Sequence, residues 1–171
     1  NLSALLDEAV SRAEATLSER SPDITGDQRH QIAEAVAMAA VKYADLAIER
    51  VKDYIFSFDR MLAFEGDTGP YLLYALVRIR SIFRKAQEAG IDTGAIESAP
   101  FDLREPSEKA LALKLLRYPS VVEGASLNHE PNRMCAYAYE LASSFSSFFD
   151  QCPVLKNDDE SIRASRLRLC A

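Results

Sequence analysis

The sequence lacks the residue patterns that most metal, redox and disulfide sites require. It has three cysteines, Cys135, Cys152 and Cys170, an odd number with no C-x-x-C pair. This usage is typical of buried thiols in a reducing compartment and not of disulfides or a zinc site. The two histidines, His30 and His129, have no cysteine, histidine or carboxylate at metal-ligand spacing. We therefore expect no metal site, and we assign both histidines to helix surfaces or caps.

Signals for a membrane or for secretion are missing as well. No apolar run approaches the roughly 18 residues that a membrane span needs. The chain begins at Asn1, without the apolar core or cleavage site of a signal peptide, and it ends in a helix-like pattern that no glycine or proline stops. These features predict a cytoplasmic protein with no membrane partner, and we expect both ends of the chain to be cuts from a longer protein.

Catalytic patterns are equally scarce. No nucleophile with an accompanying base is visible. The stretch Gly66-Asp67-Thr68-Gly69 is too short for a phosphate-binding loop, and no Lys-Ser or Lys-Thr follows it. Carboxylates in a turn before a helix, as at Glu65 and Asp67, more often serve the helix dipole and its caps. The residues alone therefore predict no catalytic residue and no cofactor site in this chain.

Acidic residues outnumber basic residues, and the net charge is −6. That value argues against a protein coated in basic surface for nucleic acid. The acidic excess is confined to residues 1–70, which hold 7 basic and 13 acidic residues, whereas residues 71–171 hold 13 of each. The second part of the chain can therefore carry local basic patches.

The hydrophobic pattern is that of helices. Apolar residues repeat at three- and four-residue spacing through most of the chain, which predicts a series of amphipathic helices. Thr25 and Gln28 have the form of a capping box, and Ser107 is a candidate cap for a helix over residues 108–118. Alternating side chains predict a short extended segment near residues 53–58. The predicted fold class is all-α, a helical bundle with that one extended segment.

The most informative stretch is a polar turn that leads into a long helix, residues 64–89. Thr68 is a good N-cap, Pro70 suits the first turn, and Gly90 suits the left-handed residue after the last turn. At 100° per residue one arc of this helix is apolar and predicted to face the core; it comprises Leu72, Ala75, Leu76, Ile79, Ile82, Phe83 and Ala86. A separate arc is aromatic and polar, and it comprises Tyr71, Tyr74, Arg78, Ser81 and Lys85.

The aromatic and basic arc is open to two interpretations. Phenol rings can stack on bases and cations can neutralise phosphates, which favours a nucleic-acid contact. The tyrosines can equally be half-buried residues at the rim of the core, with the cations on a solvated edge. Periodicity alone does not separate these alternatives.

Several motifs in this order resemble arginyl-tRNA synthetases, a class I family of aminoacyl-tRNA ligases. The central ones are FEGDTGPYLLYA at residues 64–75 and RIRSI at residues 78–82. Upstream, the resemblance includes VKYADL at residues 41–46 and DYIFSFDRML at residues 53–62. Downstream, EKAL at residues 108–111 is similar to the acid-x-Ala-Leu signature of the family's all-α anticodon-binding domain, and SRL at residues 165–167 fits the final part of that domain.

The resemblance implies a division of the chain and of its activity. It identifies residues 1–57 as the tail of the catalytic domain after its second ATP signature, and residues 58–171 as the anticodon-binding helical domain, truncated at its C-terminus. The family's HIGH and KMSKS-type signatures match nothing in the chain. The parent enzyme is expected to use ATP and magnesium for aminoacylation, while this fragment alone is predicted to be inactive and to hold no cofactor.

The resemblance also implies a site and its partners. In the family, the helix after the turn faces the anticodon stem and loop, which makes Tyr71, Tyr74 and Arg78 candidate RNA contacts, with Tyr137 on a later helix opposite them. The expected partners are arginine tRNA and the remainder of the catalytic domain, and not DNA. The alternative is a non-catalytic helical module that docks on a protein through the same arc.

Overall fold

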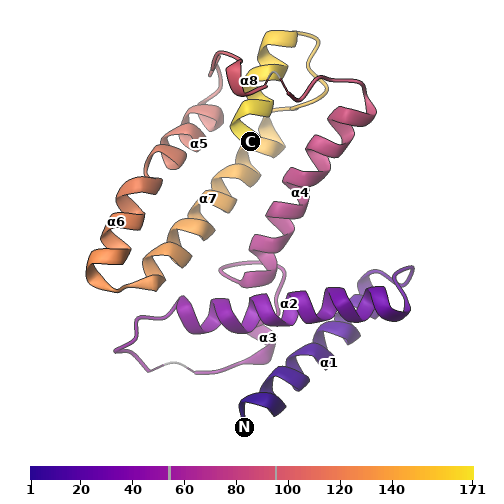
Figure 1. Ribbon diagram of the computed structural model, residues 1–171, viewed down its shortest axis with the longest axis vertical. Helices are drawn as coiled ribbons and strands as arrows, with labels where there is room; N and C mark the ends of the chain where they lie inside the picture. The colour runs from indigo at the N-terminus through magenta and orange to yellow at the C-terminus, as the bar shows by residue number, and fades with distance from the viewer. Residues whose placement is uncertain (54, 95) are drawn as a thin grey trace. The chain divides into compact units, whose positions relative to one another are not determined.

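The computed structural model describes residues 1–53, 55–94 and 96–171 as helices joined by turns and loops, with no strand in those ranges (Figure 1). This confirms the predicted all-α fold class. The helices are α1 (Leu2–Arg20), α2 (Gly26–Leu46), α3 (Phe58–Met61), α4 (Gly69–Glu88), the 3₁₀ helix η1 (Ile96–Ser98), α5 (Pro106–Leu116), α6 (Tyr118–Asn128), α7 (Pro131–Gln151) and α8 (Glu160–Cys170).

The expected extended segment near residues 53–58 is short. Residues 55–57 belong to no helix, and the backbone of Ser57 is extended, with φ −150° and ψ 117°. Tyr54 lies outside the described residues. Phe58 is already the first residue of α3, where the Ser57 side chain accepts a hydrogen bond from the Arg60 N–H.

The chain forms two compact units. The first comprises Asn1–Tyr74 and Gly124–Ala136, and the second comprises Ala75–Glu123 and Tyr137–Ala171. The helices α4, α6 and α7 each contribute residues to both units.

The core of the first unit is built from short side chains on α1 and α2. Ala9, Ala13, Ala33, Ala37 and Ala40 are each at most 2% exposed. Such small residues let two helix backbones approach closely, and larger side chains from α3 complete the cluster.

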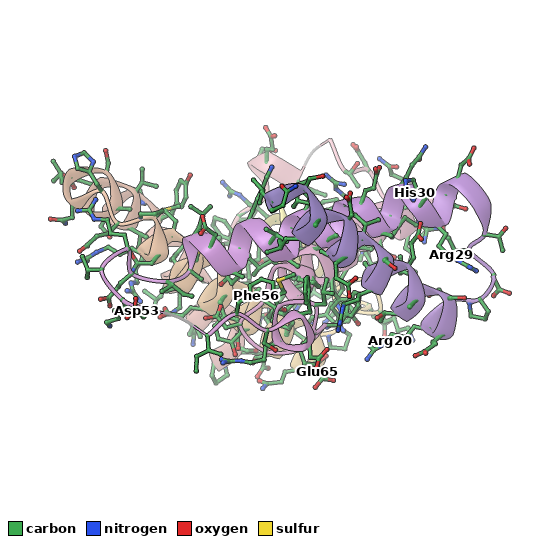
Figure 2. All side chains as sticks on the ribbon, turned by 90° about the horizontal axis from the view of Figure 1, so that it is seen from below. Arg20, Arg29, His30, Asp53, Phe56 and Glu65 are labelled. Atoms are coloured by element: carbon green, nitrogen blue, oxygen red, sulfur yellow. The ribbon has the colours of Figure 1, made fainter. Side chains whose placement is uncertain are left out.

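One end of the α1–α2 pair is polar, and Figure 2 shows Arg20, Arg29 and His30 there. The His30 Nδ1 lies 2.6 Å from Glu14 Oε1, which joins α2 to α1. This bond raises the pKa of His30, and Glu34 raises it further.

The predicted capping box at α2 is wrong. Thr25 is the N-cap residue, yet its side chain makes no capping hydrogen bond. Gly26, the first residue of α2, has φ +57°, so the chain does not enter the helix with the backbone geometry that a capping box needs.

The core of the second unit lies between α4, α5, α7 and α8. It is centred on Phe148, which is fully buried, and on Leu111 and Leu167, which are 2% and 1% exposed. The helix α7 contributes most of the aromatic volume, through Phe145 and Phe148, whose ring centroids are 6.3 Å apart.

A buried ion pair joins α5 and α8 in the second unit. Arg166 Nε lies 2.6 Å from Glu108 Oε1, with side chains 8% and 1% exposed. The second carboxylate oxygen of Glu108 accepts the N–H groups of Arg104 and Glu105 at 2.7 and 2.8 Å. Glu108 therefore caps its own helix while it neutralises Arg166.

Glu105, not Ser107, is the N-cap of α5, so the predicted cap is wrong. Ser107 lies inside the first turn, where its hydroxyl is buried 3.3 Å from Cys152 Sγ. Glu108 takes over the capping role because its carboxylate is held beside the first backbone N–H groups by Arg166.

The core-facing arc predicted for α4 is correct in part. Ala75, Ile82 and Ala86 are buried at 6%, 4% and 0% exposure. Leu76, at one edge of that arc, is 42% exposed. The centre of the buried face is rotated by roughly 40° from the predicted centre, away from Leu76 and toward Tyr71, by the geometry of 100° per residue.

Candidate nucleic-acid interface

The turn before α4 is fixed by Thr68, as predicted. Its hydroxyl donates to the Ala63 carbonyl oxygen at 2.6 Å and accepts the Tyr71 N–H at 3.3 Å. Thr68 is 8% exposed, so these bonds form largely away from solvent. The backbone of Tyr71 is thereby tied to the turn.

Asp67 in the same turn is tied to α2 and α7. The Tyr43 hydroxyl donates to Asp67 Oδ1 and lies 2.9 Å from the Cys135 carbonyl oxygen. Tyr43 is 8% exposed. This phenol joins three segments of the first unit at the base of α4.

Gly69 brings the start of α4 into direct contact with the backbone of α2. A Cβ placed on Gly69 would lie 2.3 Å from the Ala39 carbonyl oxygen, a separation that real Cβ atoms do not adopt. Glycine is therefore required at this close contact between α4 and α2.

Tyr71 and Tyr74 both belong to the first unit and differ in exposure. Tyr71 is half-buried, whereas Tyr74 is 48% exposed. Tyr74 is consequently the aromatic ring of this pair that α4 presents to solvent.

Arg78 belongs to the second unit, where it lies on α7. Its guanidinium is 4.8 Å from the centroid of the Phe149 ring, and Nη1 is 3.8 Å from Asp150 Oδ1. The Arg78 side chain is 23% exposed and the Asp150 side chain 71% exposed. A phosphate that approached Arg78 would have to compete with Asp150.

Tyr137 is a packing residue of the second unit. It is 6% exposed, and its hydroxyl donates to the Lys114 carbonyl oxygen at 3.1 Å. Burial raises the pKa of this phenol, and the neighbouring Tyr118 raises it further. An RNA contact by Tyr137 stays a prediction, and this geometry gives the side chain a structural role.

The sequence analysis did not identify Tyr118, Lys114 and Arg117, which lie near Tyr137. Tyr118 is 52% exposed, and its ring centroid is 6.0 Å from that of Tyr137. Lys114 and Arg117 both lie near Glu140, at 2.6 and 3.6 Å. The sequence signal that could have identified this site is Arg117 followed by Tyr118, a cation and an aromatic residue where α5 ends and α6 begins.

The first unit also contains an open cavity of about 690 Å³. It lies between α2, residues 55–57 and the turn before α4, and its lining includes Phe56 and Glu65, which are labelled in Figure 2. No histidine or cysteine lines it. Across residues 1–53, 55–94 and 96–171, no group of three or more metal-ligating side chains comes together.

None of the helices in the described part of the chain has both the length and the hydrophobicity to span a lipid bilayer.

Two protein families match the chain. The family model described as "DALR anticodon binding domain" matches residues 72–171. The model described as "tRNA synthetases class I (R), catalytic domain" matches residues 1–58. The predicted boundary between residues 57 and 58 stays a prediction, and the two compact units divide the chain at other positions.

Known proteins show similarity over nearly the whole chain. Two proteins named arginine–tRNA ligase, from Thermobifida fusca and Edwardsiella ictaluri, are 50% and 46% identical over 99% of this chain. The chain spans 29% of each of them. The solved structure of Thermus thermophilus arginyl-tRNA synthetase matches with a TM-score of 0.84 and 31% identity, over 99% of this chain and 28% of that one.

The model of the DALR anticodon-binding domain matches more than half of the chain, so the chain belongs to this domain family. Within it, the chain corresponds to the anticodon-binding region of arginine–tRNA ligases, together with a segment similar to their catalytic domain. The alternative of an unrelated protein-interaction module is not favoured by these matches.

Proposed function

We propose that the chain is part of an arginine–tRNA ligase and binds the anticodon arm of arginine tRNA for ATP-dependent aminoacylation by the whole enzyme. The observation that carries this proposal is 50% identity to the Thermobifida fusca ligase over 99% of the chain. The match of the anticodon-binding family to residues 72–171 supports it.

The side chains of α4 supply contacts for such a role. Tyr74 offers an exposed ring for stacking on an unpaired base, and Tyr71 beside it is held through its backbone by Thr68. Arg78 supplies a cation for a phosphate once Asp150 is displaced. In this proposal Tyr137 has a structural role, because its buried ring packs against Tyr118.

The chemistry of aminoacylation belongs to other parts of the proposed enzyme. The chain carries no HIGH or KMSKS-type signature, and its described residues gather no metal-ligating cluster. In this proposal ATP and magnesium act in the rest of the catalytic domain, which is the intramolecular partner of residues 1–57. The isolated chain is proposed to be inactive, and its parent to work in the cytoplasm.

Binding to arginine tRNA at increasing salt concentration tests the proposal. An unmodified arginine tRNA transcript is titrated into the chain, and the dissociation constant is measured between about 50 and 200 mM salt. The affinity is expected to fall steeply as salt rises, because binding releases counterions from the phosphates and added salt makes that release less favourable. Absence of binding, or binding that salt does not change, contradicts the proposal.

Activity is tested with the same preparation. Arginine-dependent exchange between ATP and pyrophosphate is expected to be at background level for the isolated chain. Exchange above that level would overturn the assignment of the chemistry to residues outside this chain.

A further inference from the structure

Tyr118 is a supported, outward-facing aromatic ring in the second unit. It is the first residue of α6 and is 52% exposed. Its ring packs on Tyr137 at a centroid distance of 6.0 Å and an interplanar angle of 41°. Tyr137 is in turn held by its hydrogen bond to the Lys114 carbonyl oxygen. The exposed ring of Tyr118 thus packs against a ring that is buried and hydrogen-bonded.

Two cations that precede Tyr118 in the chain, Lys114 and Arg117, share a single carboxylate. Lys114 Nζ is 2.6 Å from Glu140 Oε2, and Arg117 Nη1 is 3.6 Å from the same oxygen. The side chains of Lys114 and Arg117 are 22% and 59% exposed. The hydrogen bond from Lys114 lowers the pKa of Glu140, so this carboxylate is ionised at neutral pH. The three charges therefore sum to one excess positive charge.

We propose that Lys114, Arg117 and Tyr118 form a second RNA contact, here named the Tyr118 surface. Tyr118 stacks on an unpaired base of the tRNA. Lys114 and Arg117 bind the neighbouring phosphates, which replace Glu140 as the partner of the two cations. This inference rests on the proposed function and deepens it, since it names contact residues that lie on α5 and α6.

The Tyr118 surface is separate from the contact proposed at Arg78. Arg78 lies on Phe149 and Asp150, whereas the Tyr118 surface adjoins Tyr137 and Glu140 of the same helix. Tyr137 and Phe149 are 12 residues apart on α7, which corresponds to about 18 Å along the helix axis at 1.5 Å per residue. An RNA that touches both sites would therefore follow α7 over several nucleotides.

Charge favours RNA over a protein as the occupant of this surface. Leu113 and Leu116 on α5 are 64% and 75% exposed, and a protein partner would use such side chains. The excess positive charge of Lys114 and Arg117 over Glu140 instead suits the phosphates of an RNA, and the Tyr118 ring suits an unpaired base. Leu116 is therefore a matched control on the same helix.

Substitution of Tyr118 tests stacking. In titrations of the chain with the arginine tRNA transcript, Tyr118→Ala is expected to weaken binding roughly tenfold, in the range given by loss of one base–aromatic stack. Tyr118→Phe keeps the ring and is expected to bind like the original chain. Leu116→Ala is expected to leave affinity unchanged, and thermal unfolding of each variant verifies that it is folded.

Substitution of Glu140 tests the role of the cations. Glu140→Gln leaves Lys114 and Arg117 without a competing carboxylate, so tRNA binding is expected to tighten several-fold. Arg117→Gln is expected to reduce the slope of log affinity against log salt by about 1, the change expected for one phosphate contact. A residue that served packing alone would not move this slope.

The outcomes separate this inference from the function on which it rests. If the original chain binds tRNA and Tyr118→Ala binds equally well, the Tyr118 surface is overturned while the proposed function stands. If Leu116→Ala weakens binding as much as Tyr118→Ala, the contact is apolar and the inference is also overturned. If the original chain binds no tRNA, both proposals fail.

Discussion

Three tyrosines of this chain show how the same side chain takes different roles. Tyr74 is 48% exposed on the first turns of α4, Tyr118 is 52% exposed at the start of α6, and Tyr137 is 6% exposed beneath Tyr118. A base can stack only on a ring that solvent can reach. We therefore propose direct RNA contact at Tyr74 and Tyr118, with Tyr137 packed against Tyr118, and an RNA contact by Tyr137 itself stays an untested prediction.

Substitutions at Tyr74 and Tyr137 are expected to separate binding from stability. Tyr74→Ala should weaken arginine tRNA binding by about 1–3 kcal/mol, because one base loses its stacking partner. Tyr137→Phe should destabilise the chain by about 1 kcal/mol through loss of the hydrogen bond to Lys114, with affinity nearly unchanged. Titration with tRNA and urea unfolding measure the two effects, and a larger loss of affinity in Tyr137→Phe would contradict this division.

The buried pair of Glu108 and Arg166 is expected to make stability depend on pH. Burial alone would raise the pKa of Glu108, but the N–H groups of Glu105 and Arg104 and the Arg166 guanidinium outweigh it and lower the pKa below its ordinary value of 4.5. Because the folded-state pKa is the lower one, the contribution to stability is present above the unfolded-state pKa. It is lost as pH falls through the folded-state value.

Glu108→Gln is expected to lower the free energy of unfolding at pH 7 by about 3–5 kcal/mol, since it leaves the Arg166 charge buried without its partner. The matched control is Glu88→Gln, which removes the exposed pair with Arg84 and should cost less than about 1 kcal/mol. Urea unfolding from pH 7 down to pH 3 measures both. An equal loss in the two variants would show that burial of the pair has no energetic importance.

At the scale of helices, the sequence was informative about the two ends of α4 and less so about the start of α5. Thr68 and Gly90 could be assigned because an N-cap and a left-handed residue depend on local backbone geometry; Gly90 has φ +72°. Ser107 was assigned wrongly because the true cap depends on Arg166, which is 58 residues away from Glu108 in the chain.

The site could be predicted only in part for the same reason. Periodicity placed Tyr71, Tyr74 and Arg78 on one arc of α4, and the resemblance to a family suggested what that arc contacts. Neither could show that Arg78 lies on Phe149 or that Tyr137 is buried, since both depend on how α7 packs within its unit. Tyr118 was missed because the sequence predicted it as the last residue of a helix over 108–118, whereas in the structure α5 ends at Leu116 and Tyr118 begins α6.

The close contact between Gly69 at the start of α4 and the backbone of α2 leads to a prediction about stability. Gly69→Ala places a Cβ against the Ala39 carbonyl oxygen and is expected to destabilise the chain by about 1–3 kcal/mol. The melting temperature should fall by about 2–4 °C for each kcal/mol in a chain of this size. Gly124→Ala in α6 is the control, because a Cβ there meets nothing within 4 Å.

Gly124→Ala is expected to raise the melting temperature slightly, since alanine is favoured over glycine inside a helix by about 0.5–1 kcal/mol. The same chemical change thus acts in opposite directions at the two positions. Equal effects on the melting temperature would contradict the close contact between α4 and α2.

At the scale of the whole molecule, the acidic and the balanced parts of the chain have different partners in our account. Residues 1–70 carry the acidic excess and include the match to the catalytic domain, whereas residues 71–171 carry balanced charge and the match to the anticodon-binding family. RNA contact is proposed mainly for the second part, through Arg78 and the Tyr118 surface. The net charge of −6 is therefore compatible with RNA binding, because the charge is unevenly distributed.

The most direct measurement compares two RNAs with the same fold. Arginine tRNA and a variant altered only in the middle base of its anticodon are each titrated against the chain at one fixed salt concentration. Phosphate contacts are identical in the two, so any difference in affinity comes from recognition of that base. Our account predicts tighter binding of the unaltered tRNA by about tenfold, which corresponds to 1.4 kcal/mol. Equal affinity for the two, or binding of neither, would contradict the assignment of anticodon recognition to this chain.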